Sequence, residues 1–218
     1  MDAAHCIHAF PDFIRCLEKM DFSSLPGLQA QLIMAPAIRH EDISLMGAGK
    51  SPVKSSVLLL FYPDARNQPM TVLIRRPEYD GAHSGQISFP GGRYEPDDRD
   101  LAFTALRETW EEIGVNPQEV VLVGKLTDLF IPPSNFLVSP YIGTSEKRPD
   151  FRQDPKEVAA ILEFPLKDLL NPACREMTTL TLRDGLRLET PCFLLNGHVI
   201  WGATAMIISE MAAIIESL

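Results

Sequence analysis

Three glutamates near the middle of the chain, Glu108, Glu111 and Glu112, have the types and spacing that could hold a divalent metal ion. At about 100° per residue of a helix, they fall within one arc of roughly 100°. Like charges one turn apart destabilise an isolated helix by roughly 0.2–0.5 kcal/mol per pair, so the cluster favours a nearby cation. Magnesium prefers oxygen ligands and is commonly held by carboxylates together with substrate phosphates. These residues predict metal-dependent phosphate chemistry, although a charge run is also typical of a solvated helix face.

A glycine-rich loop precedes this helix and must position it. The helix is expected to begin near Asp98 or Asp100, since either carboxylate can cap its first turn. It is expected to end at Gly114, because glycine tolerates a positive φ. Apolar side chains opposite the glutamates are expected to be buried; they are Ala102, Leu106, Trp110 and Ile113.

The string Arg-Glu-Thr-Trp-Glu-Glu-Ile-Gly-Val, from Arg107 to Val115, resembles the end of the Nudix box, and Gly91-Gly92 stands where that box begins. Gly92 precedes Arg107 by one residue more than in the common box, and Asp98 takes the place of its first carboxylate. The resemblance implies an α/β fold, a Nudix-type α/β/α sandwich with a mixed β-sheet. It also implies that Arg107 braces the loop through a salt bridge within the box and that Gly114 is structural.

The segment before the box resembles the coenzyme A pyrophosphatase branch of the Nudix family. His83, Gly85 and Gln86, followed by Phe89-Pro90-Gly91-Gly92, match its signature in order and spacing, and the branch shares the longer box. Pro77 replaces a signature serine, and Asp80-Gly81 stands where leucine and arginine are common. The resemblance implies hydrolysis of the pyrophosphate bond of coenzyme A or acyl-coenzyme A, giving a 4′-phosphopantetheine product and adenosine 3′,5′-bisphosphate.

The resemblance also implies roles for particular residues. Glu108, Glu111 and Glu112 are expected to hold Mg²⁺ or Mn²⁺. The catalytic residues are expected among Glu111, Glu112 and Glu157, and which of them is the general base is left open. The expected substrate-binding residues are Arg76, His83, Gln86, Gly91 and Gly92. Structural alternatives remain: His83 as a turn residue, Glu157 as a helix-start carboxylate, and the glycines as backbone requirements only.

Two other functions are compatible with the residues. The departures at Pro77 and Asp80-Gly81 leave room for a Nudix hydrolase of another nucleoside diphosphate derivative, such as ADP-ribose, NADH or a dinucleoside polyphosphate. A Nudix module that binds nucleotide without cleaving it usually lacks box carboxylates, and none is missing here.

Composition suits a globular protein that acts on a small-molecule nucleotide. The chain has 218 residues, 45% of them hydrophobic and 22% charged, with a net charge of −9 that argues against nucleic acid or anionic membrane as a partner. No stretch approaches the ~20 apolar residues of a spanning helix, and the N-terminus lacks a basic region before an apolar run, so a cytoplasmic location is expected. Four cysteines without a Cys-x-x-Cys pair predict reduced thiols.

Hydrophobic patterning predicts the remaining elements of a single domain over residues 1–218. An amphipathic helix at 9–21 and a short helix after Pro26 form an N-terminal extension of about residues 1–33, which either covers the sheet or forms a homodimer interface. A last helix is expected at about 203–215 and a helical turn at 167–170. Strands are expected at 55–61, 71–75, 87–89, 120–123 and 137–138 and on both sides of Asn196-Gly197.

Overall fold

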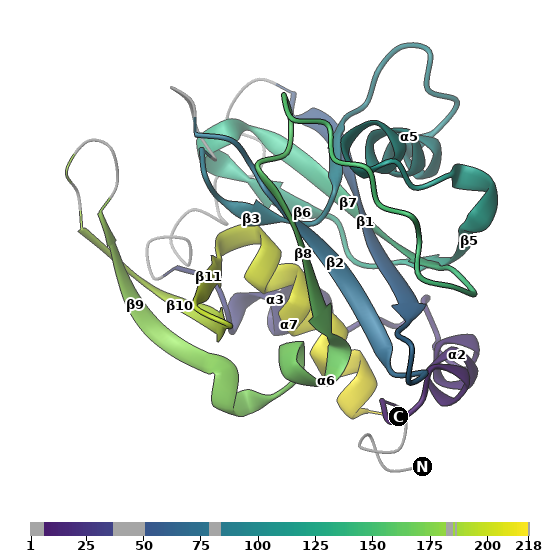
Figure 1. Cartoon of the computed structure of the whole chain (residues 1–218). Helices are drawn as coiled ribbons and strands as arrows, with labels where there is room; N and C mark the ends of the chain where they lie inside the picture. Colours follow the sequence, from purple (N-terminus) through teal and green to yellow (C-terminus); the bar gives the residue numbers. More distant parts are fainter. Residues whose placement is uncertain (1–6, 37–50, 79–83, 182–184, 186, 218) are drawn as a thin grey trace.

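A mixed sheet of eight strands forms the centre of the molecule, with helices on both of its faces (Figure 1). The computed structural model describes residues 7–36, 51–78, 84–181, 185 and 187–217. A separate sheet of three strands stands beside the main one. This arrangement confirms the predicted α/β/α sandwich with a mixed sheet.

β1 (Val53–Pro63) is the strand around which the main sheet is built. It pairs antiparallel with β2 (Pro69–Arg75) and β4 (Gly91–Arg93) and parallel with β7 (Phe136–Thr144). β3 (Ile87–Ser88) and β8 (Ala160–Pro165) pair with β2, whereas β5 (Val121–Lys125) and β6 (Leu129–Ile131) pair with β7. The apolar run of β1 is buried on both faces, which is typical of a strand with helices above and below.

α5 (Leu101–Ile113) covers one face of this sheet, where Ala105 and Ile113 pack against Leu58 and Leu60 of β1. Asp100 caps its first turn by accepting a hydrogen bond from the Phe103 N–H at 2.7 Å. Gly114 follows its last residue with φ 73°, so both predicted helix ends are confirmed.

The predicted buried side of α5 is right for Ile113, which is fully buried, but wrong for Trp110. Trp110 is 55% exposed, whereas Glu112 is only 2% exposed. The residues that face the sheet include Ala105 and Thr109, whose small side chains allow the helix to lie close to β1 and β4. The buried face therefore includes Glu112, whereas Glu111 remains exposed.

Four helices cover the opposite face: α2 (Phe10–Glu18), α3 (Gly27–Leu32), α6 (Leu166–Leu169) and α7 (Gly202–Glu216). Phe13 of α2 packs edge-on against Phe61 of β1, with ring centroids 5.0 Å apart. Ser209 of α7 donates a hydrogen bond to the Ala30 carbonyl of α3 at 2.7 Å. The N-terminal helices thus cover the sheet, one of the two arrangements expected for them.

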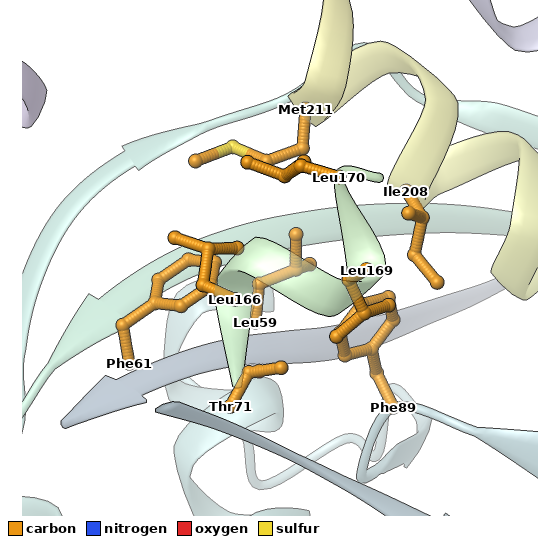
Figure 2. A pocket seen from close by; sticks show the side chains of 9 residues that line it. All are labelled: Leu59, Phe61, Thr71, Phe89, Leu166, Leu169, Leu170, Ile208 and Met211. Carbon is orange, nitrogen blue, oxygen red and sulfur yellow. The ribbon is translucent and has the colours of Figure 1, made fainter. Parts of the chain in front are cut away.

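A narrow apolar pocket lies on this same face, beneath α6 and α7 (Figure 2). Its walls include Leu59 and Phe61 of β1, Phe89 and Met211, and one polar side chain, Thr71, lines it. None of the residues that line it is a carboxylate, so it lies apart from the acidic cluster on the α5 face.

The smaller sheet has the order β11 (His198–Trp201), β10 (Arg187–Leu195) and β9 (Arg175–Thr181). Asn196 and Gly197 both have positive φ in the hairpin between β10 and β11, as their sequence predicts. Patterning does not predict β4, β6, β8 and β9 as strands; β4 and β6 have only three residues each. Three short 3₁₀ turns complete the described elements: η2 (Pro117–Glu119), η3 (Pro132–Ser134) and η4 (Pro172–Cys174).

The cysteines correct one expectation. Cys16 is disulfide-bonded, so the prediction of reduced thiols is wrong for this residue, whereas Cys174 and Cys192 are free. Pairing depends on the separation of two residues in space, which the spacing along the chain does not reveal. In the part of the chain that the structure describes, no helix has the length and apolar character needed to cross a membrane.

Candidate active site

Asp98 and Arg107 join the loop before α5 to the helix itself. Arg107 donates hydrogen bonds from Nε to Asp98 Oδ1 at 2.8 Å and from Nη2 to Asp98 Oδ2 at 3.0 Å and to the Arg93 carbonyl at 3.0 Å. Asp98 also accepts from the Glu95 N–H and from the Thr104 hydroxyl. These bonds lower the pKa of Asp98 and raise that of Arg107. The pair fixes the loop that carries the glycines against the carboxylate helix.

Arg107 also binds two of the three box glutamates. Its Nη1 donates to Glu108 Oε1 at 3.1 Å and to Glu111 Oε2 at 2.8 Å. Within the described ranges, no three His, Cys, Asp or Glu side chains converge as a group ready to hold a metal ion. Glu111 is 44% exposed at its side chain, so it is the glutamate best able to exchange this arginine for another cation.

Glu112 is buried between α5 and β4. Its Oε2 accepts a hydrogen bond from the Gly91 N–H at 2.8 Å, and its Oε1 lies 4.0 Å from Nη2 of Arg76. Burial raises the pKa of Glu112 to about 8, and the charge of Arg76 and the bond from Gly91 offset only part of this effect. A carboxylate held in this way has a strong preference for a nearby positive charge when it is ionised.

Glu108 lies directly against the backbone of Gly92. A β-carbon at Gly92 would be 2.3 Å from the carboxyl carbon of Glu108, so only glycine allows this approach. Gly91 is constrained too, since its φ is 148° and a β-carbon on it would be only 2.3 Å from the Ser56 carbonyl. Burial raises the pKa of Glu108, against the opposing charge and hydrogen bond of Arg107. The glycine pair therefore brings two acidic side chains against β4.

The segment between β7 and β8 contains Glu157 and lies near Glu108 and Glu112. Two backbone N–H groups of this segment cap the last turn of α5. Arg152 donates to the Ile113 carbonyl at 2.9 Å, and Asp154 donates to the Glu112 carbonyl at 3.0 Å. The Ala159 N–H donates to the Arg75 carbonyl of β2 at 2.8 Å, which fixes the other end of the loop. Besides burial, the negative charge of Glu157 also raises the pKa of Glu108 and Glu112, so the three carboxylates lie within electrostatic reach of one another.

Gly114 makes this arrangement possible. A β-carbon there would be 2.9 Å from Cβ of Arg152 and 3.2 Å from its backbone nitrogen. The capping loop, including Asp154, is the part of the site that sequence reasoning missed. The sequence signal that could have indicated this loop is Asp154-Pro155, which is typical of a turn. The Asp154 side chain accepts a hydrogen bond from the Lys156 N–H at 2.8 Å.

Of the expected substrate-binding residues, Arg76 directly follows β2, Gln86 directly precedes β3, and Gly91 and Gly92 belong to β4. Arg76 donates from its backbone N–H to the Gln86 carbonyl at 3.0 Å, and Gly85 donates to the Pro77 carbonyl at 3.1 Å. The Arg76 side chain donates from Nη2 to the Gly91 carbonyl at 3.1 Å. His83 lies outside the described residues, as do Asp80 and Gly81, so the structure says nothing of their placement.

The chain is similar to known proteins in sequence and in fold. The family model of the NUDIX domain matches residues 53–181. The uncharacterized Nudix hydrolase NudL of Yersinia pestis (strain Pestoides F) is 35% identical over 147 residues, which cover 67% of this chain and 73% of that protein; its counterpart in Yersinia pseudotuberculosis serotype O:1b gives the same values. A MutT/nudix family protein from Enterococcus faecalis has a TM-score of 0.51 at 16% identity, covering 81% of this chain and 69% of that chain.

The chain combines a mixed sheet between helices with a glycine-led loop that leads into a carboxylate-bearing helix. The family model and the relatives named Nudix hydrolases support its assignment as a pyrophosphohydrolase. Because the domain model matches more than half of its length, the chain belongs to the Nudix family. It is a hydrolase acting on a nucleoside diphosphate derivative, and hydrolases of this family generally need divalent metal ions.

Proposed function

We propose that the protein hydrolyses the pyrophosphate bond of coenzyme A or acyl-coenzyme A, giving a 4′-phosphopantetheine product and adenosine 3′,5′-bisphosphate. The observation that supports this substrate is the resemblance of His83, Gly85-Gln86 and Phe89-Pro90-Gly91-Gly92 to the coenzyme A pyrophosphatase signature. Backbone hydrogen bonds close the preceding loop onto β2, and Gly91 binds Glu112 directly. The signature segment therefore joins the loop that would select the substrate to the carboxylates that would act on it.

The metal of this reaction is proposed to be Mg²⁺ or Mn²⁺, held by Glu108, Glu111 and Glu112. The donor chemistry fits, because hard divalent ions take carboxylate oxygens and burial disfavours the ionised forms of Glu108 and Glu112 unless a cation is near. A bound divalent ion would neutralise negative charge on the pyrophosphate oxygens and lower the pKa of water at the site. Glu111 would have to leave Arg107 to take part.

The residues of the chain then have separate tasks. Water adds to phosphorus as the anhydride P–O bond breaks, and the proton of that water passes to Glu111, Glu112 or Glu157 as the general base. Glu157 is supported by its exposure to solvent and its electrostatic reach to Glu108 and Glu112. His83, Gln86, Gly91 and Gly92 are the residues proposed to shape the substrate site, and Arg76, also expected there, borders it through its bond to the Gly91 carbonyl.

The test is a substrate panel with product identification. The purified protein is incubated with Mg²⁺ or Mn²⁺ and coenzyme A, acetyl-coenzyme A, ADP-ribose, NADH or a diadenosine polyphosphate, and the products are separated by chromatography. Reaction in ¹⁸O-labelled water shows by mass spectrometry which phosphorus receives the water oxygen. A reaction with a chelator in place of the metal serves as the control for contaminating activity.

Adenosine 3′,5′-bisphosphate as the major product from coenzyme A is the expected result. Efficient turnover of ADP-ribose or NADH with none of coenzyme A would overturn the substrate and favour the other nucleoside diphosphate derivatives. Metal-dependent binding of nucleotide without any product would indicate a binding module instead.

A further inference from the structure

Arg76 is held at the point where three strands meet. It follows the last residue of β2, Arg75, which pairs with Ile87 of β3 and with Ala160 of β8. Its own backbone N–H donates to the Gln86 carbonyl at 3.0 Å. The backbone from which this side chain extends is therefore fixed by hydrogen bonds on both sides of β2.

The Arg76 side chain reaches from β2 to β4 and ends at Gly91. Its Nη2 donates to the Gly91 carbonyl at 3.1 Å, while the Gly91 N–H donates to Glu112 Oε2 at 2.8 Å. The separation of 4.0 Å between Arg76 Nη2 and Glu112 Oε1 is too long for a hydrogen bond but short enough for a strong charge interaction. Arg76, Gly91 and Glu112 thus form a closed arrangement in which each member contacts the other two.

Gly91 can transmit this restraint because its backbone has little freedom. It pairs with Val57 of β1, and a β-carbon would be 2.3 Å from the Ser56 carbonyl. Its two polar backbone groups are both used, one towards Arg76 and one towards Glu112. The bond from Arg76 to the Gly91 carbonyl therefore also restrains the Gly91 N–H, which positions the Glu112 carboxylate.

An arginine that binds a substrate phosphate presents its N–H groups to the open site, often in bidentate fashion. The side chain of Arg76 is only 30% exposed, and its Nη2 is directed at Gly91 and Glu112. We infer that Arg76 is a positioning residue, which fixes the Gly91 backbone and thereby the Glu112 carboxylate, and that it contributes little to binding of the substrate. This role rests on the proposed hydrolase function, since it assigns Arg76 to the orientation of Glu112 for that reaction.

The first test does not depend on the substrate. Hydrogen–deuterium exchange of the Gly91 amide is measured by NMR in the metal-free protein and in Arg76→Gln, Arg76→Lys and Arg75→Gln. Arg75 is the matched control, because it is the exposed last residue of β2 and directly precedes Arg76. Exchange at Gly91 is expected to rise by about tenfold or more in Arg76→Gln, less in Arg76→Lys, and not at all in Arg75→Gln. Unchanged exchange in a folded Arg76→Gln would overturn the inference.

The second test uses the kinetics of coenzyme A hydrolysis, or of the substrate that the panel identifies. Misplacement of a catalytic group by a fraction of an ångström lowers kcat, so Arg76→Gln is expected to lose roughly 10- to 100-fold in kcat with KM within about twofold of the unchanged protein. Arg76→Lys should recover part of the loss, since lysine can donate to the Gly91 carbonyl. A rise in KM with kcat unchanged would overturn the positioning role and restore direct substrate binding. If no substrate is turned over, the proposed function fails and the exchange measurement alone decides the role of Arg76.

Discussion

Two buried glutamates on opposite faces of the sheet show how different surroundings give one side chain type two roles. Glu112 of α5 and Glu210 of α7 are both almost fully buried. Glu210 accepts from the Gln31 amide at 2.8 Å and from the Thr127 N–H at 3.2 Å, so each of its oxygens has a neutral donor from a different part of the chain. It joins α3, α7 and the turn after β5.

The Glu112 carboxylate has fewer hydrogen-bond donors than Glu210 to offset the cost of burying its charge. It has one N–H donor, from Gly91, a more distant Arg76, and two other carboxylates, Glu108 and Glu157, within electrostatic reach. A buried charge without full compensation is costly to the fold, and such sites are commonly functional. The comparison indicates that Glu210 stabilises the structure, whereas Glu112 is held ready for a cation or a proton.

The largest expected effect is on activity, through Glu112→Gln. Glutamine keeps an oxygen that can accept from Gly91 but loses the charge, so kcat should fall by about 10²- to 10⁴-fold while the melting temperature stays the same or rises. Steady-state kinetics and thermal unfolding measure the two quantities. The control is Glu18→Gln, an exposed glutamate of α2. Activity close to that of the unchanged protein in Glu112→Gln would remove this residue from the reaction.

The opposite pattern is expected for Glu210→Leu. Removing the carboxylate leaves the Thr127 N–H without its acceptor and takes one of two acceptors from the Gln31 amide, which keeps its bond to the Thr127 carbonyl. This should lower the free energy of unfolding by about 1–3 kcal/mol. The kcat of the folded protein should not change. Urea unfolding and kinetics at a temperature where the variant is folded check both points, and a large loss of kcat at full stability would contradict the structural role.

A smaller effect is expected for Gly114→Ala on the α5 side, with Gly197→Ala in the β10–β11 hairpin as its control. Both positions have positive φ, which costs an alanine about 1–2 kcal/mol, but only Gly114 has a neighbour that a β-carbon would strike. Gly114→Ala should therefore be less stable than Gly197→Ala by urea unfolding. It should also lose kcat, because Arg152 and the loop that carries Glu157 must shift. Equal stability and activity in the two variants would show that the loop does not depend on Gly114.

The last prediction concerns the pH dependence of stability. The pKa of Glu112 is raised from its ordinary value of 4.5 to about 8, so over this window the folded protein keeps a proton that the unfolded chain has released. The stability contribution of this group is therefore lost as pH rises from about 4.5 to 8. Urea unfolding with a chelator should show a decline with pH that Glu112→Gln reduces. The same pH dependence in both proteins would contradict the raised pKa.

Local chemistry predicted much of the fold and part of the site. The ends of α5 follow from Asp100 and Gly114, and the last hairpin follows from Asn196-Gly197, because each depends on neighbouring residues only. The strands β4 and β6 escaped prediction because a run of three residues has too little pattern to distinguish it from a loop. On α5 the burial of Ile113 was predicted correctly, but hydrophobicity also placed Trp110 inside, whereas the close approach of α5 to β4 placed Glu112 there.

The sequence by itself determined the family, the helix that carries the glutamates, and the glycine pair in front of it, since these depend on residue types at fixed spacing. Only the tertiary structure decided which glutamate is buried, that Arg107 binds Glu108 and Glu111, and that Arg76 reaches Glu112 through Gly91. It also brought Glu157 to the cluster through a loop that caps α5. The physical reason is that burial, hydrogen bonding and electrostatic coupling depend on distances between segments that lie far apart along the chain.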